Sequence, residues 1–511
     1  MTGAANGMHQ NPPDSVLIIG GGTAGWMAAI LLAHAWRQHG TEITLMESAA
    51  IGTIGVGEGS TPRMRVFFER LGIPESEWMP ACNATYKCGI RFPDWSTRPG
   101  YRSYYHPFFT LDDNPFIQPF FHNADLRRRK SVAVDAHPDA FFVSQHLAQD
   151  RRAPVAGRGS YSTDYAYHFD AGLIGEFLKR KSLAMGVRHV EDTVNQVEPT
   201  GTGDIAAVHT ERHGRMAADL FVDCTGFAGL LIGRTLEVPF HSYRDHLFND
   251  SAVALPTPTE PNVGLPSETL STALRHGWAW KIPLTNRFGN GYVYSSDYCS
   301  PEEAERELRE HTGQQDPAVE ARHLKMRIGR REDCWAGNCL AVGLSQGFIE
   351  PLEATALMLV QETLEQFITA HGQGEGARAA FNRRIGQTFD GVRDYVFMHY
   401  KLNTRTDTPY WIDNRENSPC SDVVSALLST WDNRSGDILG ALNERSEQLV
   451  YSHTSWICIL AGMGRFPRNT RKAGPKHQAS DARAVASTCQ GMVPLFPDHR
   501  AVIDAMLTEA A

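Results

Sequence analysis

The sequence predicts a mixed α/β (α+β) fold, and three observations carry that prediction. Residues 16–47 have the pattern of a strand, a helix and a second strand around a glycine-rich turn. Two later apolar segments, 219–229 and 339–343, also run into glycine, as a strand does where it enters a turn. Beyond about residue 375 the apolar residues recur at helical spacing. We therefore expect a discontinuous core over residues 1–375 and a mainly helical region over residues 376–511.

The composition excludes several classes of protein. The chain has 511 residues, of which 42% are hydrophobic and 21% charged, as is usual for soluble globular proteins. Its formal charge is −9 and no long basic run is present, so neither a nucleic acid nor a membrane surface is expected as a partner. The nine cysteines are scattered without a CxxC pair, which argues against a disulfide framework and against a metal site. The first residues lack the design of a signal peptide, and we expect a cytoplasmic protein.

The first strand, SVLIIG, leads into the turn Gly20-x-Gly22-x-x-Gly25. Gly20 permits the tight turn, Gly22 lets backbone N–H groups approach a pyrophosphate, and Gly25 lets the following helix pack closely on the strand. Glu47 closes the second strand 22 residues after Gly25, where a carboxylate can bind a ribose. The pattern predicts a dinucleotide-binding unit, and the alternative is a glycine-rich turn without a ligand.

Two further strand ends could meet this turn. The segment DLFVDCTGFAG ends its apolar run at Asp223 and Gly226, and the strand before Gly343 leads to a loop and a helix that contains Pro351. Interrupted nucleotide domains of this kind are common in flavoproteins, although each segment alone could be an ordinary exit from a strand. We expect the three segments to converge on one cofactor.

The segment NATYKCGIRFPDW contains a lysine of chemical interest. Its apolar and polar residues alternate, which predicts a half-buried strand with Lys87 on the polar side. A lysine facing solvent is the ordinary interpretation. The chain has only 9 lysines against 40 arginines, however, and a partly buried lysine amine can donate, accept or attack, whereas arginine keeps its proton. Lys87 is therefore a candidate for chemistry.

Two more segments carry unusual residues. In GFIEPLEATA, Glu350 and Glu353 fall around a helix start, where acids can simply cap the helix and where free N–H groups can also bind a halide. In GWAWKIP, Trp278 and Trp280 share one face of an extended segment with Ile282, which is also what a bulky core strand would show.

The segments GGGTAGW, NATYKCGIRFPDW, GWAWKIP and GFIEPLEATA, in this order, resemble the flavin-dependent halogenases of the tryptophan halogenase family. The motif W-x-W-x-I-P is the most specific mark of that family, and the resemblance extends from Val16 to about Pro467. It implies an FAD-binding, Rossmann-like module of the flavin monooxygenase type with an added sheet. It also implies an enzyme that uses FADH2, O2 and chloride or bromide to form hypohalous acid and to halogenate an electron-rich aromatic such as an indole. A separate flavin reductase would supply the FADH2, because only one complete βαβ fingerprint is present.

The resemblance also implies roles for individual residues. Lys87 would hold or capture the hypohalous acid, and Glu353 would orient the oxidant or accept the proton of the arene. Thr355 and Ala356 would bind the halide, and Ala356 stands where relatives carry glycine, which would tighten that pocket. Trp278 and Trp280 would form a wall that keeps the arene away from the flavin.

The expected binding residues fall into two sets. We expect FAD to contact Gly20, Gly22, Thr23, Ala24, Gly25, Glu47, Glu58, Val194, Asp223, Gly226 and Leu344. We expect the arene pocket to include His106, Phe108, Trp278, Trp280, Tyr451 and Trp456.

Several alternatives stay open at the level of sequence. The stretch WICILAGMG has no acid to pair with an amino group, so free tryptophan is in doubt as a substrate, and Tyr451 and Trp456 could be ordinary core aromatics. The sequence does not separate chloride from bromide, and a homodimer is one candidate for the oligomeric state. The rival functions are an FAD-dependent aromatic hydroxylase and a catalytically silent FAD-binding protein.

Overall fold

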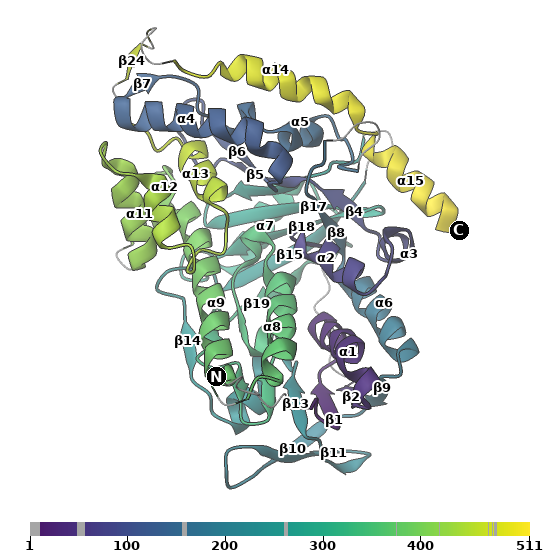
Figure 1. The fold of residues 1–511 in the computed structure, drawn as a ribbon. Helices are drawn as coiled ribbons and strands as arrows, with labels where there is room; N and C mark the ends of the chain where they lie inside the picture. The colour runs from purple at the N-terminus through teal and green to yellow at the C-terminus, as the bar shows by residue number, and fades with distance from the viewer. Residues whose placement is uncertain are drawn as a thin grey trace, which may run out of the picture.

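The computed structural model describes residues 11–48, 57–155, 161–259, 264–374, 376–417, 420–468, 470–472, 474 and 478–510. Figure 1 shows the N-terminal βαβ unit toward one end of the molecule, a large sheet in the middle and a helical layer at the opposite end. None of the helices in the described ranges is long and apolar enough to cross a membrane.

A six-stranded sheet holds the predicted nucleotide-binding unit. Its central strands are parallel because helix α1 (Thr23–Trp36) crosses between β1 and β2, and longer segments connect the others. The three predicted segments therefore do meet in one sheet, and this part of the fold prediction is confirmed. In spatial order the strands are β21 (Trp335–Ala336), β22 (Cys339–Ala341), β13 (Leu220–Asp223), β1 (Ser15–Ile19), β2 (Glu42–Glu47) and β9 (Arg188–Glu191).

A seven-stranded, mostly antiparallel sheet is the added sheet of the prediction. Trp278 and Trp280 lie on one face of its strand β17, with ring centroids 6.2 Å apart, as the alternation predicts. Both indoles are buried. In spatial order the strands are β19 (Arg322–Lys325), β15 (Ser251–Pro258), β18 (Arg287–Tyr294), β17 (Gly277–Pro283), β16 (Thr269–Ala273), β5 (Gly89–Pro93) and β6 (Ser103–Pro107).

The prediction of one half-buried strand around Lys87 is wrong. The chain changes sheet at Cys88, so that β4 (Thr85–Lys87) pairs with β8 (Ala166–Asp170), whereas the next strand, β5, belongs to the seven-stranded sheet. Protein therefore covers both faces of β4, and Lys87 is fully buried instead of facing solvent. The third strand of this small sheet is β3 (Gly57–Gly59), which pairs with the other edge of β8.

Three smaller sheets complete the strands. One is a long hairpin that protrudes from the lower end of the molecule in Figure 1. The members of the three sheets are β10 (Val194–Pro199), β11 (Ile205–Thr210) and β12 (Gly214–Met216); β14 (Phe240–Ser242), β20 (Gly329–Arg331) and β23 (Gly347–Phe348); and β7 (Val132–Ala133) with β24 (Arg471–Lys472).

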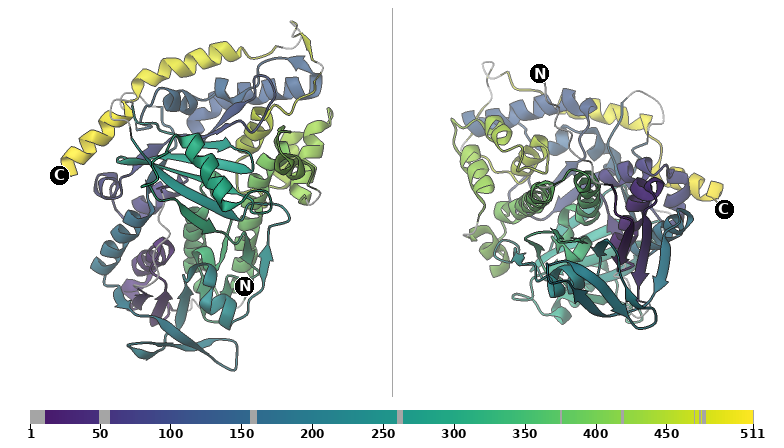
Figure 2. Two further views of the ribbon diagram at one scale, coloured as in Figure 1. Left: turned by 180° about the vertical axis from the view of Figure 1, so that it is seen from behind. Right: turned by 60° about the horizontal axis from the view of Figure 1, so that its bottom comes forward.

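The C-terminal region is mainly helical, as predicted. It is layered on the core, because α9 packs along α8, α14 contacts α4 and α5, and α15 contacts α3. Figure 2 shows α14 and α15, in yellow, along the outside of the molecule. The division at residues 375 and 376 stays a prediction. Its helices are α9 (Ala377–Leu402), α10 (Pro409–Glu416), α11 (Asp422–Asp432), α12 (Ile438–Glu444), α13 (His453–Gly462), α14 (Ala482–Met492) and α15 (His499–Ala510).

Helices of the first 375 residues cover the sheets from the other sides. They are α2 (Arg63–Arg70), α3 (Glu75–Ala81), α4 (Asn114–Lys130), α5 (Val143–Gln149), α6 (Ala171–Ala184), α7 (Pro301–Thr312) and α8 (Ala356–His371). Helix α1 packs against the six-stranded sheet and contacts both α6 and α8.

The carboxylate of Asp223 organises the backbone beyond β13. One oxygen accepts from the backbone N–H and the hydroxyl of Thr225, at 3.0 and 2.7 Å. The other accepts from the N–H groups of Leu231 and Ile232, both at 2.8 Å. Asp223 therefore caps the helical segment Leu230–Thr235 from the end of the strand.

We expect Asp223→Asn to lower the free energy of unfolding of the apoprotein by about 1–3 kcal/mol, because an amide nitrogen would face backbone donors that it cannot accept from. Denaturant unfolding measures the change. Asp219→Asn is the matched control, since Asp219 is exposed and accepts hydrogen bonds only from Ser15. Equal stability of the two variants would contradict the capping role.

Candidate active site

Most of the predicted cofactor-binding residues lie at one edge of the six-stranded sheet. This is the edge where the parallel strands end, which is where α/β proteins bind nucleotides. The residues that follow or close these strands are Gly20 after β1, Glu47 at the end of β2, Val194 after β9, Asp223 and Gly226 after β13, and Leu344 after β22.

The glycine turn fits the pyrophosphate of FAD. Helix α1 begins after Gly22, which is extended and supplies no side-chain cap, so the first N–H groups of the helix, from Thr23 and Ala24 onward, are left for an anion. A Cβ added at Gly22 would meet nothing within 4 Å, so the space before the helix is open. At Gly25, in contrast, a Cβ would lie 1.9 Å from the carbonyl oxygen of Gly20. A side chain at Gly25 would therefore clash with the turn, in keeping with the predicted close packing, and the role of Gly22 toward a pyrophosphate stays a prediction.

Glu47 lies beside this turn. A Cβ on Gly21 would come within 1.7 Å of its Oε2, and its Oε1 pairs with Lys179 at 2.7 Å. One carboxylate oxygen is therefore held by a lysine, and the other faces the glycine turn, where a ribose hydroxyl could reach it.

Glu58 is not brought to this edge. It lies in β3, in the small sheet that also carries Lys87. Burial, with a contribution from the charge of Asp170, raises the pKa of Glu58 to about 7. Its role in cofactor binding stays a prediction.

Lys87 is a buried cation with few protein partners. Its Nζ donates to the carbonyl oxygen of Ser60 at 2.9 Å and lies 5.5 Å from the centre of the Phe108 ring. Burial lowers the pKa of Lys87 to about 7, against the charge of Glu353, which raises it. The absence of a side chain at Gly59 makes this position available, because a Cβ there would lie 3.3 Å from Nζ. Within the described residues Nζ makes one hydrogen bond, so donors remain for a ligand.

Glu353 lies between two histidines. Its Oε2 is 3.3 Å from Nδ1 of His106, and its Oε1 is 3.3 Å from Nε2 of His399. The second approach is not a hydrogen bond, because Nε2 of His399 is engaged with the hydroxyl of Tyr104 at 2.8 Å, and Oε1 has no hydrogen-bond partner among the described groups. Burial alone would raise the pKa of Glu353, but His106 and then His399 outweigh it and lower that pKa to about 2. Glu353 is therefore a buried carboxylate whose Oε1 accepts no hydrogen bond from the described groups.

The helix that was predicted to contain Pro351 begins later. Pro351–Glu353 forms a separate 3-10 turn, and Ala354 has a φ of 55°, in the left-handed region, before α8 starts at Ala356. The two acids consequently do not cap α8. Thr355 stands at the helix start without a side-chain cap, and its Oγ1 is buried with no partner among the described groups. An uncapped helix start beside a free hydroxyl suits a small anion.

Three of the predicted pocket residues, His106, Tyr451 and Trp456, lie around one ring, that of Tyr395. Tyr451 stacks on Tyr395 with centroids 3.7 Å apart, Trp456 meets the same ring edge-on at 5.0 Å, and His106 lies 6.3 Å from Tyr451. The hydroxyl of Tyr451 and Nε1 of Trp456 are both buried without a partner among the described groups. Buried polar atoms left in this way are expected where a ligand or water completes the site.

The two tryptophans of β17 are held differently. Nε1 of Trp278 donates to Oε2 of Glu350 at 2.8 Å, and the same oxygen accepts from Asn249 and Tyr400. Trp280 instead fits against Gly291, where a Cβ would lie 2.0 Å from its ring. A hydrogen bond therefore holds the indole of Trp278, and close packing holds that of Trp280.

Several of these partners were not predicted from the sequence. Ser60 contributes a backbone carbonyl, for which any residue type would serve. Tyr395 and His399 stand four residues apart on α9, and this spacing places both on one face of the helix. A search for buried polar residues at helical spacing could have found that pair.

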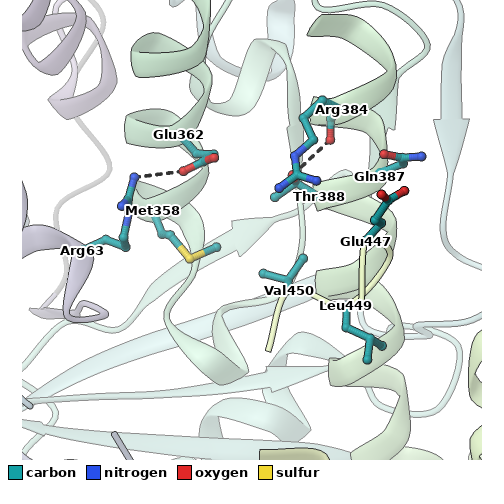
Figure 3. Close-up of a pocket in the computed structure, with 9 residues that line it drawn as sticks. All are labelled: Arg63, Met358, Glu362, Arg384, Gln387, Thr388, Glu447, Leu449 and Val450. Atoms are coloured by element: carbon teal, nitrogen blue, oxygen red, sulfur yellow. Dashed lines mark hydrogen bonds and ion pairs between the residues drawn. The ribbon is translucent and has the colours of Figure 1, made fainter. Parts of the chain in front are cut away.

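A surface cavity of about 300 Å³ lies apart from these groups (Figure 3). It is charged, and Arg63 pairs with Glu362 on one side of it at 3.0 Å. Leu449 and Val450, which precede Tyr451, form part of its wall. Neither Lys87 nor Glu353 lines it, so we do not assign the chemistry to it. Its lining consists of Arg63, Met358, Glu362, Arg384, Gln387, Thr388, Glu447, Leu449 and Val450.

A nucleotide edge and a separate buried lysine–carboxylate site define a flavin-dependent enzyme of the halogenase type, and comparisons with known proteins agree. The sequence model of the tryptophan halogenase family matches residues 15–478, and the chain belongs to that family. It is 43% identical over 447 residues to the tryptophan 6-halogenase SttH of Streptomyces toxytricini, covering 83% of this chain and 85% of the relative. It is 38% identical over 483 residues to the tryptophan 7-halogenase RebH of Lentzea aerocolonigenes, covering 89% and 90%.

Solved structures show the same fold. The crystal structure of SttH superposes with a TM-score of 0.83 at 39% identity, covering 98% of this chain and 100% of the other. BrvH, a flavin-dependent halogenase from Brevundimonas sp. BAL3, has a TM-score of 0.82 at 31% identity, covering 97% and 99%. The expectations for family, fold and enzyme class are thus confirmed.

The titration of Lys87 can be measured directly. With lysine labelled at Cε, one NMR signal should titrate with a midpoint near pH 7, and it should be missing in Lys87→Met. Glu353→Gln should lower the midpoint further, because the carboxylate favours the ammonium form. A midpoint near 10.5, the ordinary value for lysine, would contradict the buried position.

Proposed function

We propose that the protein is an FADH2-dependent halogenase that uses O2 and chloride or bromide to halogenate an electron-rich aromatic such as an indole. The observation that carries the proposal is the buried Lys87 ammonium, which has one protein hydrogen bond and shares its surroundings with Phe108 and the charge of Glu353. The family and the fold support the same activity.

The residues at the sheet edge would hold the cofactor. The glycine turn and the start of α1 would bind its pyrophosphate, and Glu47 its ribose. Reduced FAD, when bound, would supply two of the four electrons that O2 takes up; the halide gives the other two and becomes hypohalous acid, and the second oxygen atom leaves as water. We propose that a separate flavin reductase delivers it and that the protein is cytoplasmic.

Three groups of this chain would direct the oxidant. The uncapped start of α8, with Thr355 and the N–H of Ala356, would bind the halide. Lys87 would hold hypohalous acid through its free N–H donors and place it beside the ring. Glu353 would keep a negative charge opposite the ring as positive charge develops there. Although Glu353 is a weak base, a ring cation is acidic enough to lose its proton to it.

Trp278 and Trp280 would separate the two reactants. A hydrogen bond to Glu350 holds the indole of Trp278, and close packing on Gly291 holds that of Trp280. Moving either indole out of the proposed wall would therefore cost free energy. A ring as large as an indole would be excluded from the flavin, whereas hypohalous acid is small enough to cross.

The pocket beyond the wall would take an aromatic ring. Tyr451 and Trp456 offer an apolar surface with one unpartnered polar atom each. Residues 456–464 contribute no acid for an amino group. The relatives SttH and RebH act on tryptophan by name, and for this chain we propose an indole-type arene, with the side chain undetermined.

Incubation with FAD, a flavin reductase, NADH, bromide and indole tests the proposal. Mass spectrometry should show a brominated product, and Lys87→Met should lower its rate at least about 100-fold because a held reactant becomes a diffusing one. The variant should still bind FAD and release hypobromous acid, which a soluble trap reports.

A product that gains oxygen and no bromine would identify a hydroxylase instead. Absence of any FADH2-dependent product across indoles and phenols would favour a silent FAD-binding protein. Unchanged bromination by Lys87→Met would leave the family in place and remove the role of the lysine.

A further inference from the structure

The strand that carries Lys87 has one edge without a neighbouring strand. In the small sheet β8 is central, and β4 pairs with it through Tyr86 and Tyr167. The N–H of Tyr86 points the other way, toward the side chain of His499. An edge of only three residues needs partners on that side to keep its place.

The imidazole of His499 occupies this edge. Its Nε2 accepts from the N–H of Tyr86 at 3.0 Å, and its Nδ1 lies 3.2 Å from the carbonyl oxygen of Leu265. A carbonyl only accepts, so the hydrogen bonds place the ring hydrogen on Nδ1 and the lone pair on Nε2. The ring therefore links β4 to Leu265 through one accepted and one donated hydrogen bond, as the backbone of a neighbouring strand would.

The surroundings of His499 keep it in this state. The side chain is fully buried, and burial lowers its pKa to about 4, so the ring stays neutral and Nε2 stays an acceptor. His499 is the first residue of α15, and its own N–H donates to the carbonyl of Arg151 at 3.0 Å. The family match ends at residue 478, so this bond comes from a part of the chain outside it.

We propose that His499 is a positioning residue for Lys87, which fixes the outer edge of β4 so that the ammonium faces Ser60 and Glu353. The inference rests on the proposed role of Lys87 in holding the oxidant. Tyr86 is the connecting residue: its N–H is held by His499, its hydroxyl donates to Glu75 at 2.5 Å, and Lys87 follows it in the chain. Thr85 and Cys88 are held by Pro283 and Ser267, so the bond from His499 is the one that acts at the centre of the strand. Without it the N–H of Tyr86 is left unpaired inside the protein, and we expect the strand to adjust and to displace Nζ.

The test compares two products of the same turnover: halogenated indole, and hypobromous acid that escapes to a soluble trap. His499→Phe keeps an aromatic ring and removes both ring nitrogens. In this variant the kcat for bromination of indole should fall about 10- to 100-fold, with little change in KM for indole. FADH2 oxidation and FAD affinity should stay unchanged, so escaping hypobromous acid should rise.

Three further variants sharpen the result. His499→Gln, whose amide can both accept and donate, should recover most of the coupling between oxidant formed and indole brominated. Asp504→Asn, on the exposed face of α15, should behave like the parent protein. If His499→Phe does not fold, His499→Asn replaces it and should show a smaller loss of coupling.

The inference fails if His499→Phe, or His499→Asn in its place, brominates indole as the parent does while Lys87→Met does not; the proposed function then stands. It also fails if FAD affinity, FADH2 oxidation and bromination fall in equal proportion, since that is the signature of a merely structural role. If Lys87→Met brominates normally, the proposed role of Lys87 falls and the positioning role falls with it.

Discussion

The rest of the site depends on the burial of one ammonium group. Lys87 is buried, and in the part of the chain that the structure describes its Nζ has one hydrogen-bond partner, the carbonyl of Ser60. Such a group is costly to bury, and its pKa of about 7 expresses that cost. The nearby carboxylate of Glu353 keeps the ammonium form accessible, and two histidines keep Glu353 ionised. The charges of Lys87 and Glu353 oppose each other. N–H donors of Lys87 and Oε1 of Glu353 nevertheless have no hydrogen-bond partner among the described residues, and a site that holds a small polar reactant requires such groups.

The fold brings these groups together from distant parts of the chain. Lys87 lies on a three-residue strand, and Glu353 ends the 3-10 turn that comes before α8. The two histidines come from β6 and α9. The edge proposed for the cofactor is built by different strands. The strand of Trp278 and Trp280 also contacts β4, because the carbonyl of Pro283 accepts from the hydroxyl of Thr85 at 2.7 Å. The same strand therefore carries both tryptophans and supports the lysine strand.

Sequence reasoning succeeded where a local pattern determines the structure. The glycine spacing set the turn before α1, and the alternation in β17 set the shared face of Trp278 and Trp280. It failed at Lys87, where alternation suggested a solvent-facing side, because the chain changes sheet at Cys88 and protein covers both faces. The bonds of His399 and His499 to distant residues could not be predicted either, since pairings across hundreds of residues leave no periodic trace in one sequence. The position of Glu58 in cofactor binding is still a prediction.

The central claim is that the oxidant forms on one side of the tryptophan wall and reacts on the other, at Lys87. Diffraction at the bromine absorption edge, from crystals containing FAD, bromide and indole, tests this most directly. The account predicts a bromide at the start of α8 beside Thr355, and an indole ring among Phe108, Tyr451 and Trp456, with Trp278 and Trp280 between that ring and the flavin. An indole stacked against the flavin, with no bromide at α8, would contradict it.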